Sequence, residues 1–192
     1  YFQFSASFAT KTKLHLSEPN AALLASSLAI SFTVFRALSV LIALKLTPGM
    51  MILLDLITVA IGNSLVYTFA DHNMAIFTIG YVTLGAGFAS IFPSVFSAVE
   101  FHGKIQVTDW VGSILTFSGG LSEVLAPFLI GLYIDTKPYV LVYFTFLSVT
   151  LSSIALFALN SLFWFVRRPV AVSIPARNGH PHGDVFSGAV GE

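Results

Sequence analysis

The sequence has no cysteine and few charged residues. Without cysteine it can form neither a disulfide nor a thiolate metal site. Only 9% of the 192 residues are charged and 56% are hydrophobic, whereas a soluble domain carries about 25% charged residues. So few charges cannot cover a water-facing surface. The formal net charge is zero, so electrostatics indicates no nucleic-acid partner.

Several functional signatures are also missing. There is no paired intramembrane aspartate motif, no His-rich cluster in the apolar stretches, no nucleophile motif and no phosphate-binding loop. We therefore expect neither an enzyme nor an ATP-driven pump, and no cofactor. The chain opens on Tyr1 with no basic segment before an apolar core, so we expect a truncated record rather than a signal peptide.

Long hydrophobic runs dominate what is present. A bilayer core of about 30 Å needs roughly 20 apolar residues in a helix, and five windows reach that length. Short polar turns separate them, so neighbouring helices are expected to be antiparallel. We predict an all-α membrane protein, a polytopic transmembrane helical bundle in the lipid bilayer. Its one membrane domain comprises transmembrane helices at 21–46, 49–70, 74–99, 108–134 and 139–166.

The two ends of the chain differ from these windows. Residues 1–10 are aromatic and small but too few to span, so they are predicted to be the end of a truncated transmembrane helix. Residues 167–192 shift to Gly, Pro, His and charge, which predicts a cytoplasmic disordered tail. The orientation follows from the excess of basic residues at one set of helix ends. That set comprises Lys45, Lys104, Arg167, Arg168 and Arg177, against Lys11, Lys13 and Lys137 on the other.

Three charged residues, Arg36, Asp55 and Glu123, fall in the hydrocarbon core of the predicted spans, where a charge costs about 2.5–3.5 kcal/mol on insertion scales. Arg36 and Asp55 lie on adjacent helices at matching depth, roughly 10 to 14 Å from the same face. They are predicted to pair. One interpretation is a permanent structural ion pair, and the other is a cytoplasmic latch that breaks when the protein changes state.

Glu123 lies deeper, about 22 Å from the cytoplasmic end of its helix. Two interpretations stay open. The carboxylate faces a water-filled cavity and binds a proton, a sodium ion or a substrate hydroxyl, or it is protonated or hydrogen-bonded within the bundle. It belongs to a stripe of small and polar residues at helical spacing, formed by Gly112, Thr116, Gly120, Glu123, Pro127 and Gly131.

Other intramembrane residues are candidates for binding or movement. Asn63 is a candidate for hydrogen bonding to a sugar. Glycines precede Pro93 in the third window, and Gly119 and Gly120 precede Pro127 in the fourth. Such clusters are typical of helices that kink or break, as in secondary transporters, so Pro93 and Pro127 are predicted kinks.

Short motifs resemble a known family. The runs Phe35–Val40 and Leu44–Pro48 resemble the eighth helix and following loop of the major facilitator superfamily. Gly87–Ser94 and Ser122–Pro127 are similar to the tenth and eleventh helices of its sodium-dependent glucose transporter-like branch. That branch often has Gly where Ser122 stands.

The resemblance implies the C-terminal half of a major facilitator fold, with a partial helix 7 plus helices 8 to 12. The N-terminal six-helix half would then be missing. It also implies a multi-pass protein, expected in the plasma membrane with its C-terminus in the cytoplasm, and a hexose substrate with sodium as a possible coupling ion.

Two functions remain open. The chain is expected to be a fragment of a secondary active transporter that moves a small polar solute, possibly a hexose by sodium symport, through alternating access. The alternative is a non-transporting membrane assembly subunit or a degenerate transporter copy. Solute flux would separate the two.

Overall fold

The computed structural model describes residues 1–12, 14, 16–103 and 108–166, and the predicted tail and Lys104 lie outside this part. Within it the regular structure is helical, and no strand occurs. The helices are α1 (Ser5–Lys11), α2 (Glu18–Ala43), α3 (Pro48–Phe69), α4 (Met74–Phe88), α5 (Ile91–Gly103), α6 (Asp109–Tyr133) and α7 (Val140–Val166).

Five helices are long and apolar enough to cross a membrane, counting α4 and α5 together as one span. Each overlaps one of the predicted windows, so an all-helical polytopic membrane bundle is confirmed as the fold class. The third span differs from a single window because it is interrupted at Ala89–Ser90, between α4 and α5. Residues 1–10 contribute only the short helix α1 and the four residues before it.

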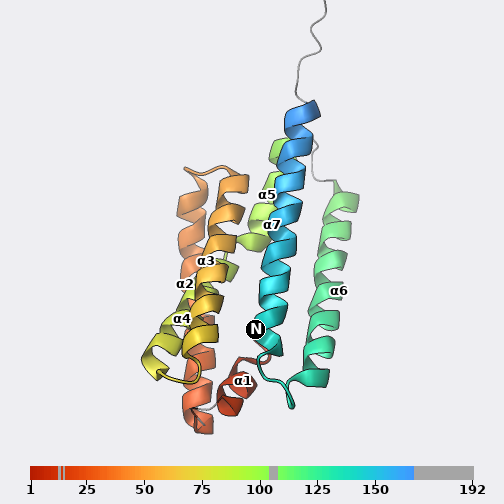
Figure 1. The fold of residues 1–192 in the computed structure, drawn as a ribbon. Helices are drawn as coiled ribbons and strands as arrows, with labels where there is room; N and C mark the ends of the chain where they lie inside the picture. The colour runs from red at the N-terminus through yellow and green to blue at the C-terminus, as the bar shows by residue number, and fades with distance from the viewer. Residues whose placement is uncertain (13, 15, 104–107, 167–192) are drawn as a thin grey trace, which may run out of the picture.

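The helices run alternately up and down (Figure 1). The turn between α2 and α3 lies at one end, together with the end of α7. The helix α1 and the turns between α3 and α4 and between α6 and α7 lie at the other end. The half-span α4 packs between α2 and α3, α7 packs on α3, and α6 stands at the edge beside α7.

Glycines allow the close approach of α4 to its neighbours. A Cβ added at Gly87 would lie 2.8 Å from the backbone nitrogen of Val59 on α3, and one at Gly85 would meet the carbonyl oxygen of Leu28 on α2. From the other side, a Cβ at Gly62 would lie 2.8 Å from the nitrogen of Leu84. Small residues at such contacts let membrane helices approach closely. The glycines before Pro93 therefore serve as packing contacts.

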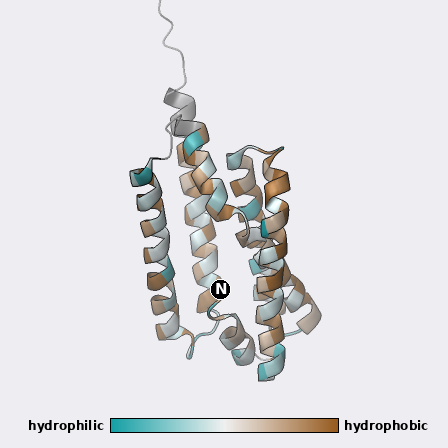
Figure 2. Cartoon of the chain, turned by 180° about the vertical axis from the view of Figure 1, so that it is seen from behind, coloured by the Kyte–Doolittle hydropathy of each residue, from teal (hydrophilic) through white to brown (hydrophobic). Residues whose placement is uncertain are grey.

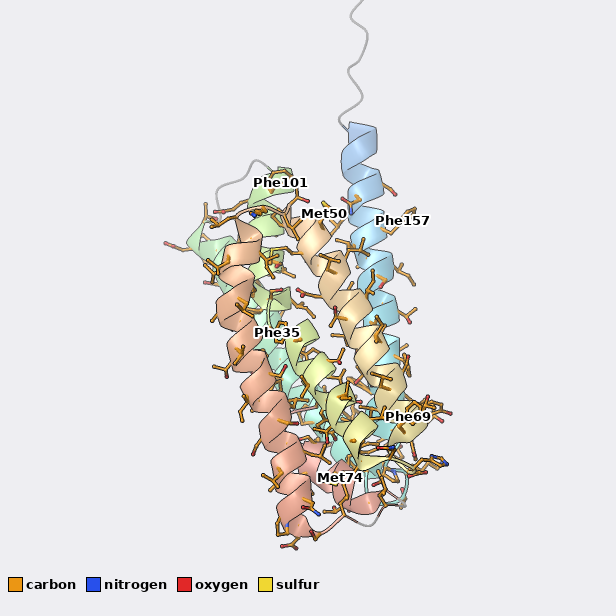
Figure 3. The ribbon with its side chains drawn as sticks, turned by 90° about the vertical axis from the view of Figure 1, so that its left-hand side faces the viewer. Phe35, Met50, Phe69, Met74, Phe101 and Phe157 are labelled. Carbon is orange, nitrogen blue, oxygen red and sulfur yellow. The ribbon has the colours of Figure 1, made fainter. Side chains whose placement is uncertain are left out.

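The outer faces carry large apolar side chains, as a bilayer requires. Apolar residues run along the length of the long helices (Figure 2). Side chains such as Met50 on α3 and Phe157 on α7 are exposed (Figure 3), and Phe157 is 75% exposed. Within the bundle, Phe8, Phe77, Tyr81 and Leu84 are fully buried and form the centre of the core.

The C-terminal end of α6 contacts α1 and the residues before it. The Lys11 ammonium at the end of α1 forms an ion pair with Asp135 in the turn after α6. A Cβ added at Gly131 would lie 3.6 Å from the ring of Phe4. These contacts place the last turns of α6 against the N-terminal segment, which determines one wall of the cavity described below.

Candidate functional site

The interruption between α4 and α5 is explained by Pro93. Proline has no backbone N–H, so the carbonyl four residues earlier, that of Ala89, has no helical donor. Arg36 supplies the missing donor, since its Nη1 lies 3.1 Å from the Ala89 carbonyl oxygen. On the next residue, the Ser90 hydroxyl donates to Oδ2 of Asp55 at 2.5 Å. Side chains of α2 and α3 thus hydrogen-bond Ala89 and Ser90, the two residues between α4 and α5.

The predicted ion pair between Arg36 and Asp55 is not formed. Among the described residues, the ion pair present is the one between Lys11 and Asp135. Arg36 instead hydrogen-bonds a carbonyl that Pro93 leaves without a partner. Asp55 is buried beside Ser90, immediately before the first turn of α5, where a helix N-terminus favours a negative charge. Pro93 does interrupt its span, although the break lies at residues 89–90 rather than at the proline itself.

This geometry predicts an energetic coupling between Arg36 and Pro93. Replacing Arg36 by Met removes the donor to the Ala89 carbonyl and is expected to lower the free energy of unfolding by about 1–3 kcal/mol. In a Pro93→Ala background the new backbone N–H can bond that carbonyl, so the same replacement should cost much less. Thermal unfolding of the four proteins in detergent would measure a coupling of about 1 kcal/mol or more.

Pro127→Ala is the matched control for this cycle. It restores a backbone N–H in a different span, on α6, and cannot reach the Ala89 carbonyl. Arg36→Met should therefore cost as much in the Pro127→Ala background as in the unchanged chain. Equal costs in all three backgrounds would contradict the role assigned to Arg36.

Asn63 lies inside the bundle and is fully buried. Its Oδ1 accepts a hydrogen bond of 2.6 Å from the Tyr1 hydroxyl, and its Nδ2 donates to the Val142 carbonyl at 3.0 Å. The amide therefore joins α3 to the N-terminal segment and to α7. Its role as a sugar ligand stays a prediction, and it does not line the cavity that contains Glu123.

A cavity of about 290 Å³ lies between the N-terminal segment, α6 and α7. This volume is near the lower end of the range for small-molecule sites, and it greatly exceeds the roughly 30 Å³ of one water. Its walls combine aromatic rings, small hydroxyl side chains and one carboxylate. The lining residues are Tyr1, Phe2, Gln3, Phe4, Phe88, Ser122, Glu123, Ala126, Pro127, Ile130, Leu141, Phe144, Thr145 and Ser148.

Glu123 contributes the charge of this cavity. No hydrogen bond or ion pair to its carboxylate is present among the described residues, and no Lys, Arg or His belongs to the cavity lining. Pro127, also on the wall, leaves the backbone carbonyl of Glu123 without its helical donor. Glu123 therefore lies on the wall of this cavity, and its binding of a proton, a sodium ion or a substrate hydroxyl stays a prediction.

The rest of the predicted stripe is not gathered at the same place. Thr116 lines a separate open groove along α6, together with Thr108 and Asp109. A Cβ added at Gly120 would meet no atom within 4 Å beyond its own helix in the described structure. Of the predicted binding residues, the cavity therefore includes Glu123. Pro127 also lines it, within the continuous helix α6, and its kink stays a prediction.

The sequence analysis did not identify the aromatic wall of the cavity, which is formed by Tyr1, Phe2 and Phe88. The Tyr1 and Phe88 ring centroids lie 6.1 Å apart, and those of Phe2 and Phe88 lie 6.5 Å apart. Phe88 is the last residue of α4, just before the break, so the interruption of this span ends beside the cavity. The aromatic residues at the start of the sequence are the available signal, although their composition alone predicts only the end of a helix.

Comparison of the chain with protein-family models, with curated proteins and with solved structures finds no match. Within the described part of the chain, no three His, Cys, Asp or Glu side chains gather as a metal site would require. The features that bear on function are therefore the cavity and the helices around it.

Proposed function

We propose that this chain is part of a secondary active transporter, the C-terminal half of a major facilitator fold, and that the cavity containing Glu123 belongs to its transport pathway. On this view the solute moves by alternating access between this half and a second six-helix half. The protein is a multi-pass membrane protein, in the plasma membrane, with its C-terminus in the cytoplasm. A sodium ion or a proton would couple to the movement through Glu123.

The single observation that carries the proposal is the carboxylate of Glu123, which faces a cavity without a protein partner. An ionisable residue within a membrane is costly, and such residues generally mark ion or substrate pathways. If Glu123 served only helix packing, its unpaired charge beside the cavity would not contribute to the stability of the bundle. Glu123 is therefore better explained by a ligand or ion than by packing.

The broken span gives additional support. Interrupted helices near substrate sites are a recurring feature of secondary transporters. Here the break at Ala89–Ser90 lies next to Phe88 on the cavity wall, so a change in angle between α4 and α5 would alter that wall.

Solute uptake tests the proposal. The longest natural chain that contains this sequence would be reconstituted into liposomes, and the uptake of labelled glucose and of labelled organic amines measured with and without a sodium gradient. Saturable uptake of either kind of solute is expected, with empty liposomes as the control. Absence of saturable uptake for both would favour the alternative, a non-transporting assembly subunit or degenerate copy.

A further inference from the structure

We infer that the cavity of Glu123 binds a monovalent organic ammonium ion with an apolar or aromatic body, rather than a neutral sugar. This inference rests on the proposed function for its biological meaning, because it names the class of solute. Three properties of the cavity lining favour such a ligand: its charge, its hydrogen-bonding capacity and its aromatic rings.

The side chains of the lining favour a cation. Glu123 is the charged side chain of the cavity lining, and no basic side chain of that lining offsets it. The Arg36 guanidinium, also within the membrane, is already engaged with the Ala89 carbonyl. Glu123 is exposed beside the cavity. A carboxylate without a partner in a membrane span is unfavourable, and a bound positive charge would reduce that penalty. A neutral sugar would leave it in place.

The hydroxyl groups of the lining have already used their protons. Ser122 donates to the Ser118 carbonyl, Thr145 to the Leu141 carbonyl, and Ser148 to the Phe144 carbonyl, each at 2.9 Å. The Tyr1 hydroxyl likewise donates to Oδ1 of Asn63 at 2.6 Å.

A hydroxyl that donates in this way retains only its acceptor lone pairs. With the Glu123 carboxylate, these groups make the cavity rich in acceptors and poor in donors. An ammonium group is a donor without acceptor capacity, so it matches such a lining. A hexose carries many hydroxyl oxygens that need donors, and among the lining side chains Gln3 would have to supply them.

The aromatic rings favour the same ligand. Tyr1, Phe2 and Phe88 form one continuous wall, and Phe4 and Phe144 also belong to the lining. Aromatic faces attract cations and pack against apolar groups, which is how proteins recognise organic ammonium ions. The cavity of about 290 Å³ is also much larger than a bare sodium ion needs. Charge, hydrogen bonding and shape thus agree on an organic amine.

Equilibrium binding tests the inference with three probes. The longest natural chain that contains this sequence, purified in lipid nanodiscs, would be titrated with 2-phenylethylamine, with its neutral analogue 2-phenylethanol, and with glucose, in both potassium and sodium chloride. The amine is expected to bind about 10-fold or more tightly than either neutral probe. Glu123→Gln, which keeps size but removes charge, should weaken amine binding by roughly 10- to 100-fold and leave the alcohol unaffected.

Two control variants accompany this test. Glu100→Gln removes an exposed carboxylate on α5 outside the cavity and should leave amine affinity unchanged. Phe88→Leu should weaken amine binding by about 2- to 30-fold, whereas Phe157→Leu, on an exposed face of α7, should not.

Equal affinity for the amine and the alcohol, or an amine affinity that Glu123→Gln does not change, would overturn the inference. Glucose bound and transported while the amine is ignored would overturn it too, yet leave the proposed transporter function intact. Amine binding that depends on Glu123, without uptake of any solute by the longer chain, would instead defeat the transporter function and retain the binding site.

Discussion

Replacing Glu123 by Gln is expected to abolish solute uptake driven by a sodium or proton gradient, to below about 1% of the rate of the unchanged protein. The carboxylate lies at the cavity of about 290 Å³ and no described residue pairs with it, so its charge is available to a solute or a coupling ion. The Gln side chain has nearly the same size, so packing around Pro127 should persist. Initial uptake rates in proteoliposomes, measured on the longest natural chain, would record the loss.

The ion dependence of uptake distinguishes two roles for this residue. If Glu123 carries the coupling ion, the Gln variant should still exchange solute down its own gradient but ignore the sodium or proton gradient. If it binds the solute, exchange should disappear as well. Glu100→Gln is the control and should retain full rate and coupling. An unchanged rate and an unchanged ion dependence in Glu123→Gln would reduce the residue to a packing role.

Replacing Gly85 by Leu is expected to prevent the folded bundle from forming. A side chain at this position meets the carbonyl oxygen of Leu28, and its first atom alone would lie 3.0 Å from both the backbone nitrogen of Phe32 and Cβ of Ser31. Backbone atoms cannot move aside as a flexible side chain can, so α2 and α4 must separate. Separation would also break the bond of 2.6 Å from the Ser31 hydroxyl to the Val82 carbonyl. We expect a loss of about 3 kcal/mol or more.

Gly120→Leu is the matched control for Gly85→Leu. Both substitutions raise the hydropathy of a membrane span equally, so insertion into the bilayer should not distinguish them. At Gly120 the described structure leaves open space, because an added Cβ meets no atom within 4 Å beyond its own helix. Size-exclusion profiles and thermal melts in detergent should show a monodisperse, stable Gly120→Leu protein and an aggregated or early-melting Gly85→Leu protein. Similar melts for both would contradict the packing role of Gly85.

The helices were predictable because hydropathy over some twenty residues is a long signal. Each of the five long apolar windows contains a helical segment long and apolar enough to span a membrane, and the ends differ by only a few residues. The break at Ala89–Ser90 was only partly predictable. Pro93 indicates a missing backbone donor, but the residue that replaces that donor lies on another helix and no local pattern reveals it.

The partners of the intramembrane polar residues were less predictable than their presence. Matching depth suggested that Arg36 and Asp55 pair with each other, because opposite charges are the simplest solution in lipid. A comparison of depths considers only the charged side chains. The Ala89 carbonyl lacks a helical donor because of Pro93, and it accepts a hydrogen bond from the Arg36 guanidinium. Asn63 was similarly identified as polar and intramembrane, while its engagement with Tyr1 and Val142 depends on contacts between distant segments.

The order of the helices along the chain suits the way the break is stabilised. A carbonyl without a donor is costly in hydrocarbon, so a segment containing Pro93 would enter a bilayer poorly by itself. Arg36 and Asp55 both precede it in the sequence, on α2 and α3. During synthesis, which proceeds from the N-terminus, these two side chains are therefore already in the membrane when the interrupted segment arrives. The Ala89 carbonyl can therefore obtain its donor from a helix made earlier, without depending on a helix made later.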